Sequence, residues 1–132
     1  MFILDFFYDF PLLGNLLKKQ LDSLKDGINY INNSIPLILS DWNSQELVKK
    51  STRQFLDSLE AGEPEKSFKS HFDNLGKLKD YKGIKSIEGN NYLAEAAFEK
   101  GLVQIQVQLT QDRDKWLINN FQVNYLFQLN SN

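Results

Sequence analysis

Several residue types on which protein chemistry often depends are missing or scarce in this chain of 132 residues. There is no cysteine, which excludes a disulfide framework, a thiolate metal site and a cysteine nucleophile. His71 is the only histidine, so a metal site built from several histidines is excluded as well. The spacings of phosphate-binding loops, hydrolase serine nucleophiles and zinc metalloproteases do not occur. The residues therefore predict no catalytic, metal or cofactor site.

The charge balance and the short apolar runs narrow the range of partners. The net charge of -2 gives no general attraction to nucleic acid, and we expect no nucleic-acid partner. Six lysines gather between Lys66 and Lys85, but acidic residues elsewhere cancel them, and we interpret them as a solvated face. No apolar run approaches the roughly 20 residues that a membrane-spanning helix needs. As written, the chain predicts a cytoplasmic protein, or a secreted or periplasmic one whose leader has been removed.

The first ten residues are rich in aromatic side chains, and two interpretations compete for them. The segment can be a packing arm that covers the domain's own core or a partner subunit. Alternatively, it can anchor the chain at a membrane surface, where aromatic rings are favoured. Asp5 and Asp9 oppose an anionic lipid surface, so we favour packing and expect no membrane contact through this end. The aromatic residues are Phe2, Phe6, Phe7, Tyr8 and Phe10.

A long amphipathic helix is predicted from Pro11. Proline suits a first helical turn, and apolar residues then recur every three or four positions as far as Ile35. Gly27 weakens the middle of this helix, so a break near Asp26–Gly27 is conceivable, and Pro36 should end it. The stripe fits either packing on the chain's own domain or a dimeric coiled coil, and we favour the former. Its apolar residues are Leu13, Leu17, Leu21, Leu24, Ile28, Ile31 and Ile35.

Two further helices and a strand follow. Ser44 is predicted to cap a helix over Gln45–Ala61, which Gly62 and Pro64 terminate. A shorter helix covers Pro64–Asn74. The polar stretch Lys77–Lys82 reads as a loop before a first strand at Lys82–Glu88.

Three antiparallel strands between Tyr92 and Leu129 dominate the rest of the chain. Apolar residues alternate with other residues in each, as expected for a sheet with one buried face. Trp116 and Ile118 lie out of phase with the apolar residues from Phe121 onward, and a bulge at Asn119–Asn120 would bring both groups to the core face. The expected inward residues are Tyr92, Ala94, Ala96, Phe98, Val103, Ile105, Val107, Leu109, Trp116, Ile118, Phe121, Val123, Tyr125, Phe127 and Leu129.

The region Ser44–Tyr125 resembles the nuclear transport factor 2-like (cystatin-like) superfamily, and more narrowly small bacterial proteins of unknown function with that fold. The resemblance implies helices packed in the concave face of a bent antiparallel sheet, often with a pocket between helix and sheet and often with dimers formed by the outer face. Its enzymes pair a pocket carboxylate with a tyrosine, for which Asp80–Tyr81, or Tyr92 with Glu95, are the nearest candidates. The matching residues are Phe98, Gly101, Val103, Ile105, Val107, Trp116, Ile118, Phe121 and Val123.

We therefore predict an α+β fold in which helices pack on a bent antiparallel sheet of about four strands. Residues 1–132 would form a single domain, with an aromatic arm and amphipathic helix over 1–43 and an α+β roll over 44–132. His71 is interpreted as a surface or capping residue, although a pair with Asp73 or a distant aspartate stays open.

The first functional hypothesis is a non-enzymatic binding or assembly module, which holds a protein partner or a second copy in a homodimer. The alternative is an enzyme or small-ligand carrier that uses a pocket between helix and sheet, with no ligand indicated by the residues. A polar row on the third strand, neighboured by Glu95 and Glu99, suits a protein contact as well as it suits plain hydration. The predicted interface consists of Gln104, Gln106, Gln108, Thr110, Phe2, Phe6 and Phe7.

Overall fold

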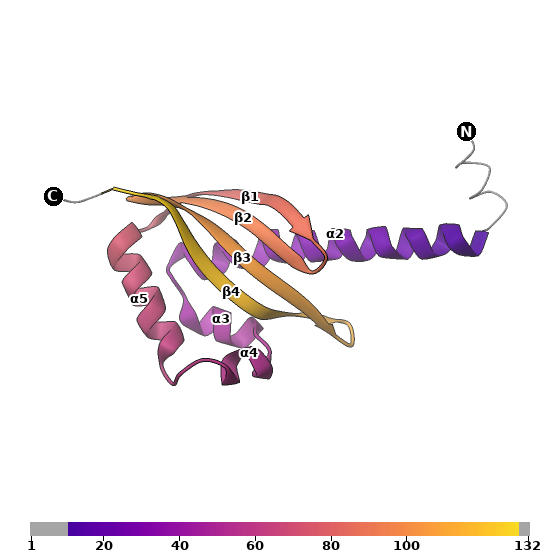
Figure 1. Ribbon diagram of the computed structural model, residues 1–132, viewed down its shortest axis with the longest axis horizontal. Coiled ribbons are helices and arrows are strands. Elements are labelled where there is room, and N and C mark those ends of the chain that lie inside the picture. The colour runs from indigo at the N-terminus through magenta and orange to yellow at the C-terminus, as the bar shows by residue number, and fades with distance from the viewer. Residues whose placement is uncertain (1–10, 130–132) are drawn as a thin grey trace.

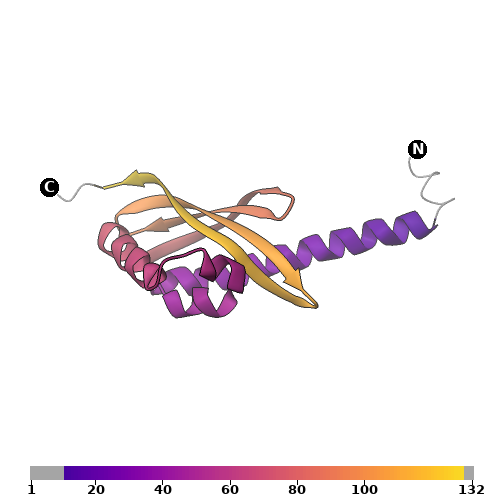
Figure 2. The ribbon, with the colours of Figure 1, turned by 60° about the horizontal axis from the view of Figure 1, so that its bottom comes forward.

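The computed structural model describes residues 11–129, and the predicted aromatic arm with Phe2, Phe6 and Phe7 lies outside them. Four antiparallel strands form one open sheet in the order of the chain (Figure 1). They are β1 (Leu78–Glu88), β2 (Asn91–Phe98), β3 (Gly101–Asp112) and β4 (Lys115–Gln128). The helices α2 (Pro11–Ser40), α3 (Ser44–Lys50), α4 (Arg53–Asp57) and α5 (Glu63–Leu75) lie on one side of this sheet (Figure 2). The predicted α+β class is confirmed.

The core lies between the inner face of the sheet and the C-terminal half of α2. Tyr92, Ala94, Ala96 and Phe98 of β2 are buried, and the odd residues of β3 from Val103 to Leu109 are buried beside them. From the helix side, Ile31, Ile35, Ile38 and Leu39 fill the same hydrophobic cluster. The alternation of apolar and other residues in β2 and β3 therefore predicted correctly which face of these strands is buried.

Helix α2 runs without a break through Gly27, where the sequence left a break open, and through Pro36, where the sequence predicted its end. Gly27 is buried there, and a methyl group at this position would overlap the Tyr92 hydroxyl and lie 3.7 Å from Cη2 of Trp116. Glycine therefore allows the strands to approach the helix closely. The prediction that Pro36 ends the helix is wrong, because α2 continues to Ser40. Ile35, Ile38 and Leu39 are fully buried on either side of Pro36, and this packing offsets the roughly 3 kcal/mol that an internal proline costs.

The N-terminal half of α2 extends past the β1–β2 turn and the β3–β4 turn, away from the rest of the fold (Figure 1). Residues 15–26 are all exposed, whereas the packing on the sheet begins near Gly27 and Ile28. The amphipathic stripe predicted by the sequence is thus buried over only its second half.

The helix predicted over Gln45–Ala61 is two short helices, α3 and α4, and its cap is displaced by one residue. The side chain of Asn43, not Ser44, accepts the N–H of Glu46 at 3.2 Å. The interruption lies at Ser51–Thr52, where the Thr52 N–H donates to the Ile118 carbonyl of β4 at 2.8 Å. The Thr52 hydroxyl also caps α4 by accepting the Phe55 N–H at 3.0 Å. A tertiary bond and a new cap therefore replace the expected helical turn.

The third predicted helix is close to the observed α5, with Pro64 in its first turn. The loop predicted over Lys77–Lys82 is wrong for most of its length, because β1 begins at Leu78. Its pairing with β2 shifts register at three places, so β1 lacks the regular alternation by which a strand is recognised from sequence.

The predicted bulge in β4 is confirmed. Gln108 pairs with Asn120 and Leu109 with Ile118, which leaves Asn119 without a partner on β3. Ile118 is buried, and Trp116, Phe121, Val123 and Tyr125 pack against the core. The inward placement of Phe127 and Leu129 is wrong, since these side chains are 57% and 53% exposed. A second register shift, which leaves Leu126 unpaired, turns Phe127 to the outer face opposite Leu102.

Candidate functional site

The outer face of the sheet carries a field of uncharged amide side chains. Gln104, Gln106, Gln108 and Thr110 lie side by side along β3, on the face opposite the core, as predicted. Glu95 neighbours Gln104 on this face, but Glu99 does not belong to it. The Glu99 carboxylate instead accepts the Lys77 N–H at 2.7 Å, and this bond is the main cause of its lowered pKa.

Strand β4 adds a second row of amide side chains, which was not predicted from the sequence. Gln104 pairs with Asn124, Gln106 with Gln122 and Gln108 with Asn120. The bulge residue Asn119 ties this row to the helices, because its side chain donates to Gln108 Oε1 at 3.4 Å and accepts from the Thr52 hydroxyl at 2.7 Å. Three opposed pairs of uncharged amide side chains thus form a hydrogen-bonding surface beside Glu95. The alternation of amides with apolar residues after the bulge was the signal that could have revealed it.

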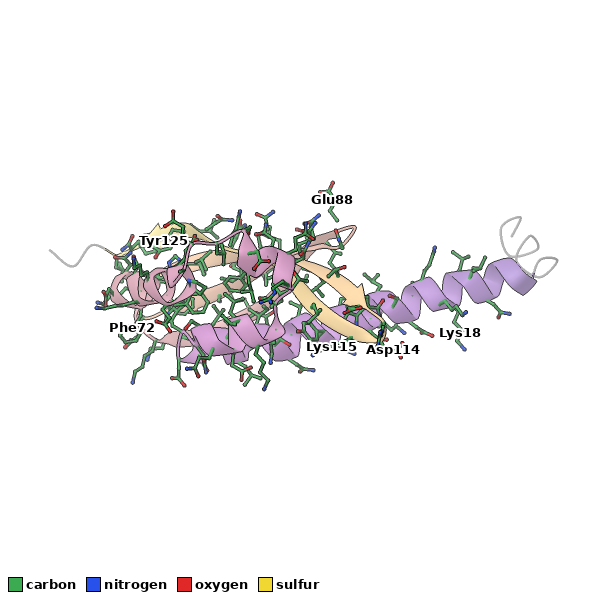
Figure 3. All side chains as sticks on the ribbon, turned by 90° about the horizontal axis from the view of Figure 1, so that it is seen from below. Lys18, Phe72, Glu88, Asp114, Lys115 and Tyr125 are labelled. Carbon is green, nitrogen blue, oxygen red and sulfur yellow. The ribbon has the colours of Figure 1, made fainter. Side chains whose placement is uncertain are left out.

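A second exposed surface is the projecting part of α2. Leu16 and Leu21 are each 57% exposed, and Leu17 and Leu24 in the same segment are 37% and 38% exposed. Lys18, which sits on this projecting stretch in Figure 3, flanks the stripe. An isolated helix of this length is marginal in water, since most helical stability comes from a buried face. The stripe is therefore an apolar surface that the other described residues leave exposed.

An aromatic cluster surrounds His71 where α2, α5 and the end of the sheet meet. The Trp42 ring stacks on Phe98 with centroids 4.9 Å apart and lies 5.2 Å from the His71 ring. Its indole N–H donates to the Gly76 carbonyl at 3.0 Å. Trp42 is buried and helps to organise the core.

His71 itself is not the surface or capping residue that the sequence suggested. Its Nδ1 lies 2.7 Å from the Tyr125 hydroxyl and its Nε2 3.2 Å from the Ser67 hydroxyl. Asn74 donates to the Tyr125 oxygen at 3.4 Å, so the tyrosine proton is free to point at Nδ1. In that arrangement the Nε2–H donates to Ser67, whose oxygen is an acceptor and not an activated nucleophile. Burial lowers the pKa of His71, which keeps the ring neutral near pH 7.

The other candidate residues from the sequence are not brought together. Tyr92 is buried on the core face, while Glu95 lies on the outer face of the same strand. Tyr81 donates to the Asn32 side chain at 2.9 Å, and burial raises its pKa to about 12. Asp80 pairs with Lys82 at 3.3 Å. The lysines between Lys66 and Lys85 are all exposed, spread over α5, the following turn and β1.

Comparisons of the chain with protein-family models, with curated proteins and with solved structures give no match. The resemblance to the nuclear transport factor 2-like superfamily therefore stays a prediction. Among residues 11–129, no helix is both long enough and apolar enough to cross a membrane. The same residues contain no cluster of three or more side chains of the kinds that commonly hold a metal ion.

Proposed function

We propose that this protein is a binding or assembly module that acts through the projecting stripe of α2 and the amide face of its sheet. The observation that carries the proposal is the exposure of Leu16, Leu17, Leu21 and Leu24 on the projecting part of α2. Covering these side chains would contribute about 1 kcal/mol each, given their partial exposure. Apolar surface that the described part of the chain leaves uncovered in this way is typical of an interaction site.

The alternative, an enzyme or ligand carrier with a site between helix and sheet, has less support. That space is occupied by Ile31, Ile35, Val103, Ile105 and other fully buried side chains. The polar cluster around His71 is bound to Tyr125 and Ser67, which favours a structural role for the histidine.

A photo-crosslinking amino acid at Leu21, in the cells that make the protein, tests the proposal. Leu21 lies on the stripe, and Lys19 on the opposite side of the helix is the matched control, because both are exposed. We expect a defined adduct, with a second copy or with one other protein, from position 21 and not from position 19. Absence of an adduct, or equal adducts from both positions, would contradict the proposal.

A further inference from the structure

The two edges of the sheet differ in their protection against pairing with another strand. β1 carries five charged residues, including Lys79, Lys82 and Lys85, and its register shifts three times. Lysines and bulges are the usual means by which proteins keep an edge strand from pairing with other chains. β4 is longer, contains no proline, and carries one charged residue, Lys115 at its first position. One edge is thus protected and the other is open.

The open edge has a defined length. At Ile118 it is closed by the Thr52 N–H, which donates to the Ile118 carbonyl. Between the bulge at Asn119 and the unpaired Leu126, residues 120–125 pair regularly with β3. The Leu109 N–H donates to the Asn90 carbonyl on the β2 side, so the even residues of β3 direct their backbone groups to β4. These even residues pair with the even residues of segment 120–125, and the odd residues of the segment therefore direct their backbone groups outward. Six regular residues therefore present a strand edge with which no other segment of residues 11–129 pairs.

We infer that a second copy of this chain covers this edge by adding its own β4 in antiparallel orientation, with Val123 of both copies at the two-fold axis. In this register Phe121 lies opposite Tyr125 of the second copy on the core side. On the outer side, Gln122 lies opposite Asn124 of the second copy. The segment is therefore self-complementary on both faces, and no charged side chain faces another across the axis.

The pairing also extends the amide surface. Each chain contributes the cross-strand amide pairs Gln106–Gln122 and Gln104–Asn124. The amide pairs of the two chains then meet across the axis in one continuous eight-stranded sheet. Phe127 and Leu126, which are 57% and 49% exposed in the single chain, come to lie beside residues 119 and 120 of the second copy. This inference rests on the proposed assembly function and names its partner, a second copy, and the strand that joins the two.

The absence of cysteine makes the arrangement directly testable. In the Val123→Cys variant the two introduced thiols would face each other across the axis, at a separation that a disulfide can bridge. We expect mild oxidation to convert most of the protein to a reducible covalent dimer. Asn120→Cys is the control on the same strand, because its two copies would be about 20 Å apart. Lys82→Cys is the control on the protected edge.

A second variant keeps the inference testable if a cysteine at Val123 disturbs folding. Gln122 and Asn124 are exposed on the single chain, so Gln122→Lys with Asn124→Lys should leave the fold intact while placing lysines opposite each other in the dimer. Sedimentation equilibrium should then show self-association at least tenfold weaker than in the unaltered chain.

Disulfide formation that is equal at positions 123, 120 and 82, or unaltered self-association of the double-lysine variant, would overturn the inference. If those results coincide with an adduct from position 21, the proposed function stands and only the β4 contact is wrong. If position 21 gives no adduct either, both fail.

Discussion

Replacement of Gly27 by alanine gives a quantitative test of how α2 packs on the sheet. In an uncovered helix this change would stabilise the fold by about 1 kcal/mol. Here the new methyl group would overlap the Tyr92 hydroxyl and lie 3.2 Å from its Cζ. Tyr92 is only 4% exposed, so its rigid ring has little room to move. Overpacking of this kind costs about 1–3 kcal/mol. We therefore expect Gly27→Ala to lower the free energy of unfolding, by up to about 2 kcal/mol.

Removing the hydroxyl should reduce this cost. In a Tyr92→Phe background the overlap with the hydroxyl is gone and only the 3.2 Å contact with Cζ is left, so Gly27→Ala should destabilise the fold less than it does with tyrosine, because the propensity gain of about 1 kcal/mol offsets more of the crowding. Urea unfolding of the four chains gives the coupling energy between the two positions, which we expect to be about 1–3 kcal/mol. Gly14→Ala is the control, because a Cβ at Gly14 meets nothing within 4 Å.

Two results would refute this reasoning. If Gly27→Ala stabilises the fold equally with tyrosine and with phenylalanine at position 92, the helix does not approach β2 as described. If it destabilises both backgrounds equally, the obstruction is something other than the hydroxyl.

Three other predictions follow from particular contacts. Thr52→Ala should cost about 1–2 kcal/mol, because it removes the cap of α4 and the bond to Asn119, whereas Thr52→Ser should retain most of the stability in the same unfolding assay. Burial lowers the pKa of His71 from its ordinary 6.5, so the folded state favours the neutral ring. The free energy of unfolding should therefore be at its full value above pH 6.5 and decrease as the pH drops below 6.5. In His71→Gln this decrease should be weaker. Phe127→Ser should change the free energy of unfolding of the single chain by less than about 0.5 kcal/mol, because this side chain is exposed. The buried control Ile105→Ala should cost about 2–5 kcal/mol. A large loss of stability in Phe127→Ser would show that β4 lacks its second register shift.

The parts of the fold that follow local rules could be predicted from the sequence. The alternation in β2 and β3 identified the buried face, and the phase slip at Asn119 predicted the bulge. Failures occurred where tertiary contacts outweigh local preference. Pro36 stays helical because its neighbours are fully buried, and the helix after Ser44 is interrupted because Thr52 bonds to Ile118.

Only part of the candidate site could be predicted from the sequence, because the rest depends on contacts between segments that are far apart in the chain. The polar row on β3 has a strict period of two, so its outward direction was evident. Its amide partners on β4 depend on the register across the bulge, which residue types alone do not determine. The exposure of the α2 stripe depends on where the sheet ends, and the cluster around His71 depends on α5 meeting β4. Neither of these two arrangements can be recognised from the residue types of the segments involved.

Amide hydrogen exchange along α2 tests most directly whether its projecting stripe is an interaction surface. In dilute protein, we expect residues 15–26 to exchange at least about 100-fold faster than residues 31–39, because only the latter are held by the core. Residues 15–26 should become protected when the partner captured from position 21 is added. Slow exchange of residues 15–26 in the dilute single chain, or fast exchange that persists in the complex, would contradict the assignment of this stripe as a binding surface.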